Sequence, residues 1–280
     1  MNISFKQSNS ISSLKSYCEL YKNCFNEKKL KLNYLNWLYN KNPTGNFVGI
    51  DCFHDGNLIG QVGGIPREFI FNQKKVRFLI SINVCVDPKY QGKWIFSKML
   101  TRFEKIAKEL NFNGIIGISN KAATPFWQRT IKMKKLGALD VFLGFGKLSL
   151  NKINKSNYNF YSCWDKKNLE WRIRNPVNET YIQTYNNHCS VYSKTNFLFI
   201  NAYSPLIFFD KNLKLNITKK NYKPIVYIGL ISEFKKTKLL FDLPEFLKPS
   251  PLNFLYKSFD PSINLKKEKI FFTFLDFDIF

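Results

Sequence analysis

The chain has 280 residues, of which 45% are hydrophobic and 17% aromatic, and its formal net charge at pH 7 is +23. This composition differs from that of a disordered chain and is sufficient for one large domain or two small ones. The longest apolar stretch, around residues 224–232, is too short to cross a bilayer, and the N-terminal MNISFKQSNS lacks a signal core. We therefore expect a cytoplasmic protein without membrane insertion.

Cysteine and histidine spacing does not indicate a metal site. No two cysteines have CxxC spacing, and His54 and His188 lie far apart in the sequence. We expect no metal and a reducing compartment. The positive charge can attract polyanionic cofactors or sugar nucleotides, or reflect a coding bias toward Lys, Asn, Ile and Phe. We do not expect a nucleic-acid partner, because no Arg-rich stripe or RNA-binding signature is present.

The first third of the chain predicts a helix followed by antiparallel strands. Residues 10–25 have apolar side chains at spacings of three and four, with Ser10 as a cap. An aromatic segment then ends at Asn42-Pro43. Strand patterns follow at residues 47–53, 58–66 and 76–86, and the Asp55-Gly56 pair indicates a hairpin between the first two.

After Gln91 the apolar period changes to that of a helix. An amphipathic helix that ends near Gly114 is predicted by the spacing of Ile95, Met99, Phe103, Ile106 and Leu110. The pattern then predicts a buried strand at 114–119, a helix at 123–132, and a strand pair or one long strand at 139–148.

The polar residues 151–158 are the predicted linker between two domains, 1–150 and 159–280. The second half repeats part of the first: Leu-x-Trp, at Trp37 and at Trp171, is followed by Asn-Pro and a strand pattern. A helix that stops before proline explains this spacing, and its recurrence indicates duplicated architecture. Further strands are predicted at 197–203, 225–232 and 269–280.

The turn between the strand 76–86 and the next helix carries the clearest functional signal. A strand that enters a helix through a tight turn binds phosphate, because the N–H groups converge and the helix dipole adds positive charge. The order of elements over about residues 10–148 resembles the GNAT superfamily of N-acetyltransferases. Its motif, Gln/Arg-x-x-Gly-x-Gly/Ala after Val-x-Pro, matches Val86-Asp87-Pro88 and Gln91-Gly92-Lys93-Trp94-Ile95-Phe96.

Four short segments, WLYNKNP, the Asp-Gly hairpin, VDPKYQGK and GISN, are similar to the bacterial branch found with surface-polysaccharide genes. The segment LEWRIRNP is similar to the divergent partner domain of two-domain members. The resemblance implies an α/β (α+β) fold, with a mixed, mostly antiparallel central sheet flanked by helices. It also implies a second, divergent GNAT-like domain that contributes to the acceptor site.

The resemblance further implies acetyl-CoA or another acyl-CoA as co-substrate. The strand 78–86 would separate from the strand 114–119, so that backbone groups bind the pantetheine and polarise the thioester. The turn would hold the pyrophosphate. The implied cofactor-binding residues are Val84, Cys85, Val86, Gln91, Gly92, Lys93, Trp94, Ile95, Phe96 and Asn120.

Three departures from the family pattern bear on activity. Trp94 and Phe96 stand where the motif has glycine or alanine, and Trp127 stands where the family commonly has a tyrosine that protonates the leaving thiolate. No carboxylate lies in the central strand. The candidates for a catalytic base are Glu68, Asp87 and the pair Asp276 and Asp278, which lie on one face of the strand 269–280. If the pair is buried, one carboxylate would have a raised pKa and could accept a proton; the alternative is an exposed polar strand face.

These features favour an acyl-CoA-dependent N-acetyltransferase that acts on an amino sugar, free or nucleotide-linked, in surface-polysaccharide synthesis. The amine would attack the thioester directly. Two alternatives stay open. One is a FemAB-like aminoacyl transferase that uses aminoacyl-tRNA, and the other is a decayed GNAT domain that serves as a non-enzymatic binding module.

Overall fold

The computed structural model describes residues 2–25, 30–92, 94–149, 155–185, 188–197, 199–209, 221–232, 235–244, 247–248 and 250–277. The chain forms two compact units of discontinuous segments. The first comprises Met1–Arg67, Val76–Lys135 and Phe254–Ser262, and the second comprises Glu68–Lys75, Leu136–Asn253 and Ile263–Phe280. This division differs from the predicted consecutive halves in three segments: Glu68–Lys75 and residues 136–150 belong to the second unit, and Phe254–Ser262 belongs to the first. Within the predicted linker, Lys155–Asn157 forms the 3-10 helix η2.

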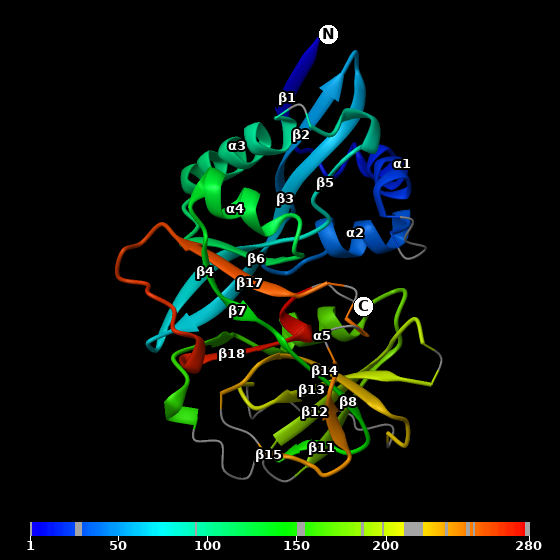
Figure 1. Cartoon of the computed structure of the whole chain (residues 1–280), viewed down its shortest axis with the longest axis vertical. Helices are drawn as coiled ribbons and strands as arrows, with labels where there is room; N and C mark the ends of the chain where they lie inside the picture. The colour runs from blue at the N-terminus through cyan, green and yellow to red at the C-terminus, as the bar shows by residue number, and fades with distance from the viewer. Residues whose placement is uncertain are drawn as a thin grey trace. The chain divides into compact units, whose positions relative to one another are not determined.

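The first unit is a sheet with helices on both faces (Figure 1). Its strands are β1 (Ile3–Gln7), β2 (Val48–His54), β3 (Asn57–Phe71), β4 (Lys74–Ser81), β5 (Cys85–Val86), β6 (Gly114–Ser119) and β17 (Asn253–Ser258). Its helices are α1 (Leu14–Phe25), α2 (Leu32–Asn40), η1 (Pro88–Tyr90), α3 (Ile95–Glu109) and α4 (Thr124–Ile131). The strand order is β1-β2-β3-β4-β6-β17, antiparallel from β1 to β3 and parallel between β4 and β6. No helix in the described part of the chain is long and apolar enough to span a membrane.

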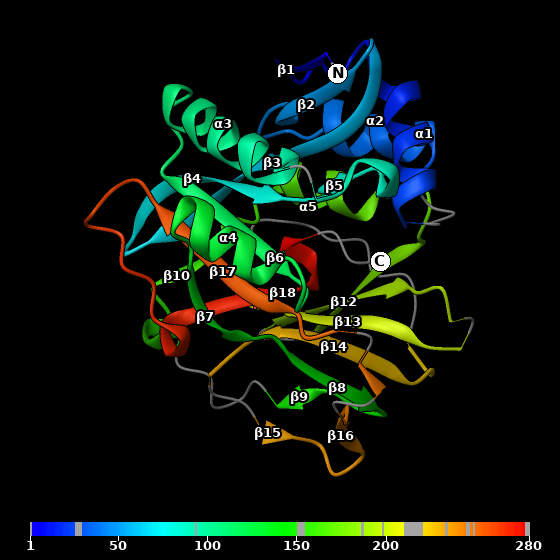
Figure 2. The ribbon, with the colours of Figure 1, turned by 45° about the horizontal axis from the view of Figure 1, so that its top comes forward.

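Alternation along β2 assigns the two faces of this sheet. Ile50 and Cys52 belong to a buried cluster with Met99 of α3 and Trp127 of α4. The side chain between them, Asp51, points to the opposite face, where it accepts a hydrogen bond from the Tyr17 hydroxyl at 2.8 Å. Helices α3 and α4 therefore cover one face, where Figure 2 shows them side by side, and α1 covers the other.

The first helix is shorter than predicted, and it buries only two residues of the predicted face, Leu14 and Tyr21. It begins at Leu14, and Ser10 is not its cap but donates a hydrogen bond from Oγ to Asn40 Oδ1 at 2.6 Å. Ile11, which was predicted to lie on the buried face, is 74% exposed. The buried side chains of α1 are Leu14, Tyr17, Leu20 and Tyr21.

The predicted strand 76–86 is in fact two strands. β4 ends at Ser81, Asn83 has a φ of +50°, and β5 begins at Cys85. β4 pairs with β6 from Phe78↔Gly114 to Ser81↔Gly117, whereas β5 pairs with β3. The bend at Asn83 therefore ends the pairing with β6, while the chain continues to pair with β3.

The second unit is mainly β-structure among the described residues. Its elements are β8 (Asp140–Gly144), β9 (Leu148–Ser149), β10 (Phe160–Ser162), α5 (Lys166–Ile173), β11 (Thr180–Tyr185), β12 (His188–Lys194), β13 (Asn201–Leu206), β14 (Ile225–Leu230), β15 (Lys235–Lys236), β16 (Leu240–Asp242), η4 (Lys267–Lys269), β18 (Ile270–Thr273) and η5 (Phe274–Asp276). The end of β3 and the start of β4 belong to this unit, and β7 (Lys134–Ala138) passes into it.

The second unit repeats the strand order of the first. β11, β12 and β13 are successive antiparallel strands, and β13 pairs in parallel with β14. In the first unit β2, β3, β4 and β6 follow one another in the same order, and β4 pairs in parallel with β6. Helix α5 precedes β11 as α2 precedes β2, with Asn-Pro between helix and strand each time. The sequence repeat therefore coincides with a repeat of topology.

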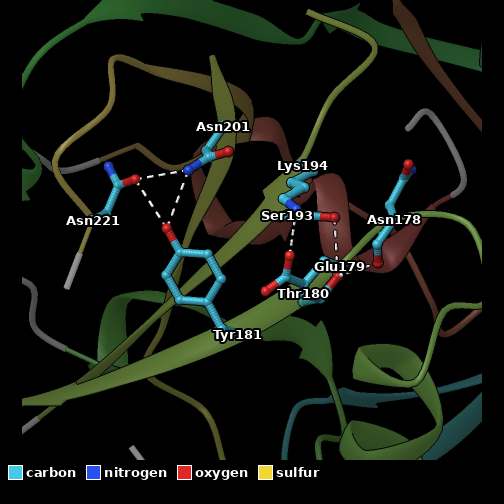
Figure 3. A network of polar contacts seen from close by, with 8 residues as sticks. All are labelled: Asn178, Glu179, Thr180, Tyr181, Ser193, Lys194, Asn201 and Asn221. Atoms are coloured by element: carbon cyan, nitrogen blue, oxygen red, sulfur yellow. Dashed lines mark hydrogen bonds and ion pairs between the residues drawn. The ribbon is translucent and has the colours of Figure 1, made fainter. Parts of the chain in front are cut away.

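Hydrogen bonds between side chains fix the start of β13, which begins at Asn201 rather than at the predicted residue 197 (Figure 3). The Asn201 amide donates to Asn221 Oδ1 at 2.7 Å and to the Tyr181 oxygen at 3.1 Å. The Tyr181 hydroxyl donates to Asn221 Oδ1 at 3.0 Å. This triangle joins β11, β13 and the segment before β14.

The C-terminal segment is a short strand and a helical turn, not the predicted strand 269–280. β18 ends at Thr273, and Asp276 caps the 3-10 helix η5 that follows. The buried Asp276 carboxylate accepts hydrogen bonds from the Thr273 N–H at 2.6 Å and from the Ser162 hydroxyl. Asp276 is therefore not on a strand face, and Asp278 lies outside the described residues.

Candidate active site

A cavity of about 540 Å³ lies in the first unit, along β5 and the starts of α3 and α4. It gathers nine of the ten predicted cofactor residues: Val84, Cys85, Val86, Gln91, Gly92, Trp94, Ile95, Phe96 and Asn120. The tenth, Lys93, lies outside the described residues. Three chain segments that are separate in sequence thus meet at one concave surface.

Backbone groups of β5 face this cavity because β4 has β3 and β6 as neighbours, whereas in the described part of the chain β5 pairs with β3 alone. The Asp87 N–H donates to the Ile59 carbonyl at 2.8 Å, so antiparallel alternation makes Cys85 and Gln61 the next bonded pair. The N–H and C=O of Val86 then point away from β3. Since pairing of β4 with β6 ends at Ser81, this edge of β5 has no neighbouring strand among the described residues.

Two buried tyrosines support the bend that separates β4 from β5. The Asn83 side chain donates a hydrogen bond to the Tyr39 oxygen at 3.1 Å, and Tyr39 shares a hydrogen bond with Tyr21 at 2.6 Å. Burial raises the pKa of both phenols well above the ordinary value, so both stay protonated. The pair holds Asn83 in its left-handed conformation.

The turn before α3 is closed by its own polar groups. Asp87 caps η1 by accepting a hydrogen bond from the Lys89 N–H at 2.9 Å, and the Gln91 amide donates to the Val86 carbonyl at 3.1 Å. Gly92 has a φ of +80°, and a Cβ at this position would meet nothing within 4 Å. The turn therefore leaves open space next to its backbone.

The start of α3 presents unpaired backbone donors to the cavity. The first N–H bonded within this helix is that of Lys98, which donates to the Trp94 carbonyl at 3.0 Å. The Trp94 side chain does not cap the helix, and the N–H groups of Ile95, Phe96 and Ser97 have no hydrogen-bond partner among the described residues. Together with the helix dipole, they form a site suited to an anion such as a pyrophosphate.

Trp94 occupies a conformation that favours glycine. Its φ is +60°, in the left-handed region, at the position where the family motif has glycine. The indole is 77% exposed and lies at the rim of the cavity without filling it. The turn therefore retains its glycine-like backbone although the side chain is bulky.

Asn120 lies just before α4 and Trp127 lies within this helix, and their surroundings differ. Asn120 lines the cavity, and its Oδ1 accepts a hydrogen bond from the Ala123 N–H at 2.8 Å. Trp127 is 3% exposed, belongs to the core and contacts Phe96 edge to face at 6.1 Å. Trp127 does not line the cavity, so it cannot meet a leaving thiolate there.

Sequence reasoning missed several residues that line the cavity. They are Cys24, Phe25, Tyr90, Ser97, Ala122, Ala123 and Phe126. The Tyr90 hydroxyl lies 3.3 Å from His54 Nδ1, which ties the turn to the end of β2. Tyr90 directly precedes the motif and Ser97 directly follows it, so both could have been included. Nothing in the sequence indicated that the last turn of α1, with Cys24 and Phe25, packs near β5.

None of the described residues that line the cavity is an aspartate or a glutamate. Asp276 belongs to the second unit, and its carboxylate is occupied in capping η5. Glu68 forms an ion pair with Lys75 at 3.1 Å, and Asp87 caps η1. Neutral polar groups and thiols, rather than a carboxylate, therefore surround the described part of the site.

Comparisons with known proteins agree with this geometry. The sequence pattern of the Acetyltransferase (GNAT) family matches residues 14–131. No curated protein sequence matches the chain. Among solved structures, a probable N-acyltransferase from Enterococcus faecalis is similar with a TM-score of 0.58 at 11% identity, over 92% of this chain and 73% of the other.

Two further solved structures are similar over most of the chain. A GCN5-related N-acetyltransferase from Anabaena variabilis gives a TM-score of 0.57 at 11% identity, over 91% of this chain and 73% of the other. Eis1 from Mycobacterium abscessus gives 0.51 at 10% identity, over 80% and 65%. At such identities these structures support the fold, and the sequence match supports the family. Residues 14–131 therefore match the GNAT family of acetyltransferases, and the fold of the chain is similar to that of solved N-acetyltransferases.

Proposed function

We propose that this enzyme transfers an acyl group from acyl-CoA to the amine of an amino sugar, free or nucleotide-linked, during surface-polysaccharide synthesis in the cytoplasm. The observation that carries the acyl-CoA part is the open start of α3 beside the unpaired edge of β5. The N–H groups of Ile95, Phe96 and Ser97 would hold the pyrophosphate, and Gly92 leaves room for its close approach.

The chemistry follows from backbone donors. The Val86 N–H faces the cavity and would polarise the thioester carbonyl as negative charge develops on its oxygen. The acceptor amine would attack the carbonyl carbon directly, within one complex of enzyme and both substrates. A coenzyme A thiolate is a good leaving group, so water can protonate it without a tyrosine at residue 127.

For Asp276 we propose a structural role in place of the predicted catalytic one. Its carboxylate holds the turn at Thr273 and the hydroxyl of Ser162. The Asp276→Asn variant is expected to lose thermal stability while kcat falls no more than the folded fraction does. A loss of kcat by a hundredfold or more in fully folded Asp276→Asn would restore the catalytic assignment, and the same measurement on Asp278→Asn tests the other predicted carboxylate.

The amino-sugar acceptor is supported by the resemblance to the polysaccharide branch. The net charge of +23 also favours an anionic acceptor such as a sugar nucleotide. A direct test measures thiol release from acetyl-CoA with a panel of 4-amino-4,6-dideoxy sugar nucleotides. Polyamines and peptide N-termini serve as non-sugar amines. We expect the highest kcat/KM with a sugar nucleotide.

Each alternative has its own readout. Release of thiol only with peptide or polyamine acceptors would remove the sugar and keep acyl transfer. Thermal stabilisation by coenzyme A without turnover on any amine would favour a binding module. A gel shift with tRNA that weakens with salt would favour the FemAB-like alternative.

A further inference from the structure

Two cysteines from different elements line the cavity. Cys24 lies in the last turn of α1 and Cys85 in β5, and α1 packs against β5. Both are free cysteines, and they line this one cavity from two different elements. The other four cysteines, Cys18, Cys52, Cys163 and Cys189, do not line this cavity.

The two thiols differ in acidity. A hydrogen bond from the Cys85 thiol lowers the pKa of Cys24, although burial and the nearby Asp87 oppose this. Burial raises the pKa of Cys85 well above the ordinary value. The thiolate is the nucleophile in disulfide exchange, so Cys24 is the attacking group and Cys85 keeps its proton until a second step.

We propose that Cys24 is a site of reversible modification by coenzyme A disulfide, with Cys85 as the resolving thiol. The proposal rests on the proposed function, because binding of the coenzyme A moiety in the cavity delivers the disulfide to Cys24. A coenzyme A held covalently at Cys24 occupies the cavity and excludes acyl-CoA. Oxidation of the cofactor pool would thereby stop acyl transfer until Cys85 releases the adduct.

The exchange balances without another oxidant. In the first step the Cys24 thiolate attacks one sulfur of coenzyme A disulfide. A Cys24–coenzyme A bond forms, the original disulfide bond breaks, and one coenzyme A thiolate leaves and takes a proton from water. In the second step Cys85 loses its proton to water and attacks Cys24 Sγ. The Cys24–Cys85 disulfide forms and the second coenzyme A thiolate leaves, so two protein thiols are oxidised and one disulfide is reduced.

Intact-mass spectrometry of the full chain with coenzyme A disulfide, followed by peptide mapping, tests the assignment. The wild type should lose two hydrogens and yield joined Cys24 and Cys85 peptides. Cys85→Ser should stop at one coenzyme A adduct on Cys24, and Cys24→Ser should show neither product. Cys18→Ser is the matched control on the same helix and should behave as the wild type, because burial raises the pKa of Cys18.

Several outcomes would overturn the proposal. One is an unmodified wild type, another is equal labelling of Cys24→Ser and wild type, and a third is no difference between Cys85→Ser and wild type. Thermal shift with coenzyme A separates this failure from that of the proposed function. A shift with coenzyme A but no modification at Cys24 overturns only the thiol proposal. If coenzyme A does not raise the melting temperature, the proposed function and the thiol proposal both fail. This holds even if the oxidant diamide joins Cys24 to Cys85.

Discussion

Replacing Trp94 with glycine should stabilise the free enzyme and tighten coenzyme A binding. A non-glycine residue in the left-handed region costs about 1–2 kcal/mol, and Trp94 has a φ of +60°. Relief of this strain is partly offset, by roughly 0.5–1 kcal/mol, because a glycine loses more conformational entropy on folding than another residue does. Little packing is lost, because the indole is 77% exposed.

The net gain is therefore about 0.5–1 kcal/mol, which for a chain of this size corresponds to a rise in Tm of about 1–4 °C. Differential scanning calorimetry measures Tm without ligand, and isothermal titration calorimetry measures the Kd for coenzyme A. We expect Kd to fall several-fold in Trp94→Gly, because the Cβ and indole no longer restrict the approach of the pyrophosphate to the turn.

Trp94→Ala is the matched control, because it removes the indole but keeps a Cβ in the left-handed region. Its Tm should stay at or below that of the wild type. Equal Tm values for the alanine and glycine variants would refute the strain argument. A Tm of Trp94→Gly below the wild type would refute it as well, and an unchanged Kd would refute the argument about access.

Three further predictions concern the framework of the first unit. Gly114→Ala should lower the free energy of unfolding by about 3 kcal/mol in urea titrations, because the new Cβ would lie 2.2 Å from the Lys257 carbonyl oxygen. Gly117→Ala is the control, and an equal loss of stability in both variants would contradict this reasoning. Burial raises the pKa of Asp51 in the folded protein. The free energy of unfolding of the wild type, relative to Asp51→Asn, should therefore be greatest at pH values below the usual aspartate pKa and should fall as pH rises through the pKa of folded Asp51. Unfolding free energies of both proteins from pH 3 to pH 8 test this slope, and a difference independent of pH would disprove it. Trp127→Ala should cost about 3–5 kcal/mol of stability, whereas Trp127→Tyr should not raise kcat, because residue 127 is buried away from the cavity; a clear rise in kcat would return the acid role to this position.

Elements with strong local signals could be predicted from the sequence. The strand Gly114–Ser119 was predicted at its observed bounds, and the helix Ile95–Glu109 was predicted with its apolar face, although it ends several residues before the predicted end near Gly114. Both follow from local features: a short apolar run bounded by glycine and asparagine, and a sustained helical period. The turn at Gln91 and Gly92 was recognisable for the same reason, since its chemistry lies within a few consecutive residues.

Features that depend on distant partners could not be predicted. The bend at Asn83 is stabilised by Tyr39, far away in sequence, and no local pattern marks it. β17 joins β6 although a long stretch of chain separates them. The alternating pattern of FLDFDIF resembles a strand, but the hydrogen bonds of Asp276 to Thr273 and Ser162 favour a helical turn.

The candidate site divides in the same way. The cofactor residues on β5 and at the start of α3 could be predicted because one motif contains them. Cys24 could not, because its place beside Cys85 depends on how α1 packs against the sheet. The left-handed backbone at Trp94 was also hidden, since the residue type argues against it.

Strand β3 runs through Asn57–Phe71, and the boundary between the two units falls within it, after Arg67. Cutting the chain near residue 150 would therefore not produce two fragments that each contain a complete unit. The N-terminal piece would lack Phe254–Ser262, and the C-terminal piece would lack Glu68–Lys75. Limited proteolysis in that region should yield a nicked but associated species, and neither fragment expressed alone should refold. Each unit therefore depends on a peptide segment that the other half of the sequence encodes.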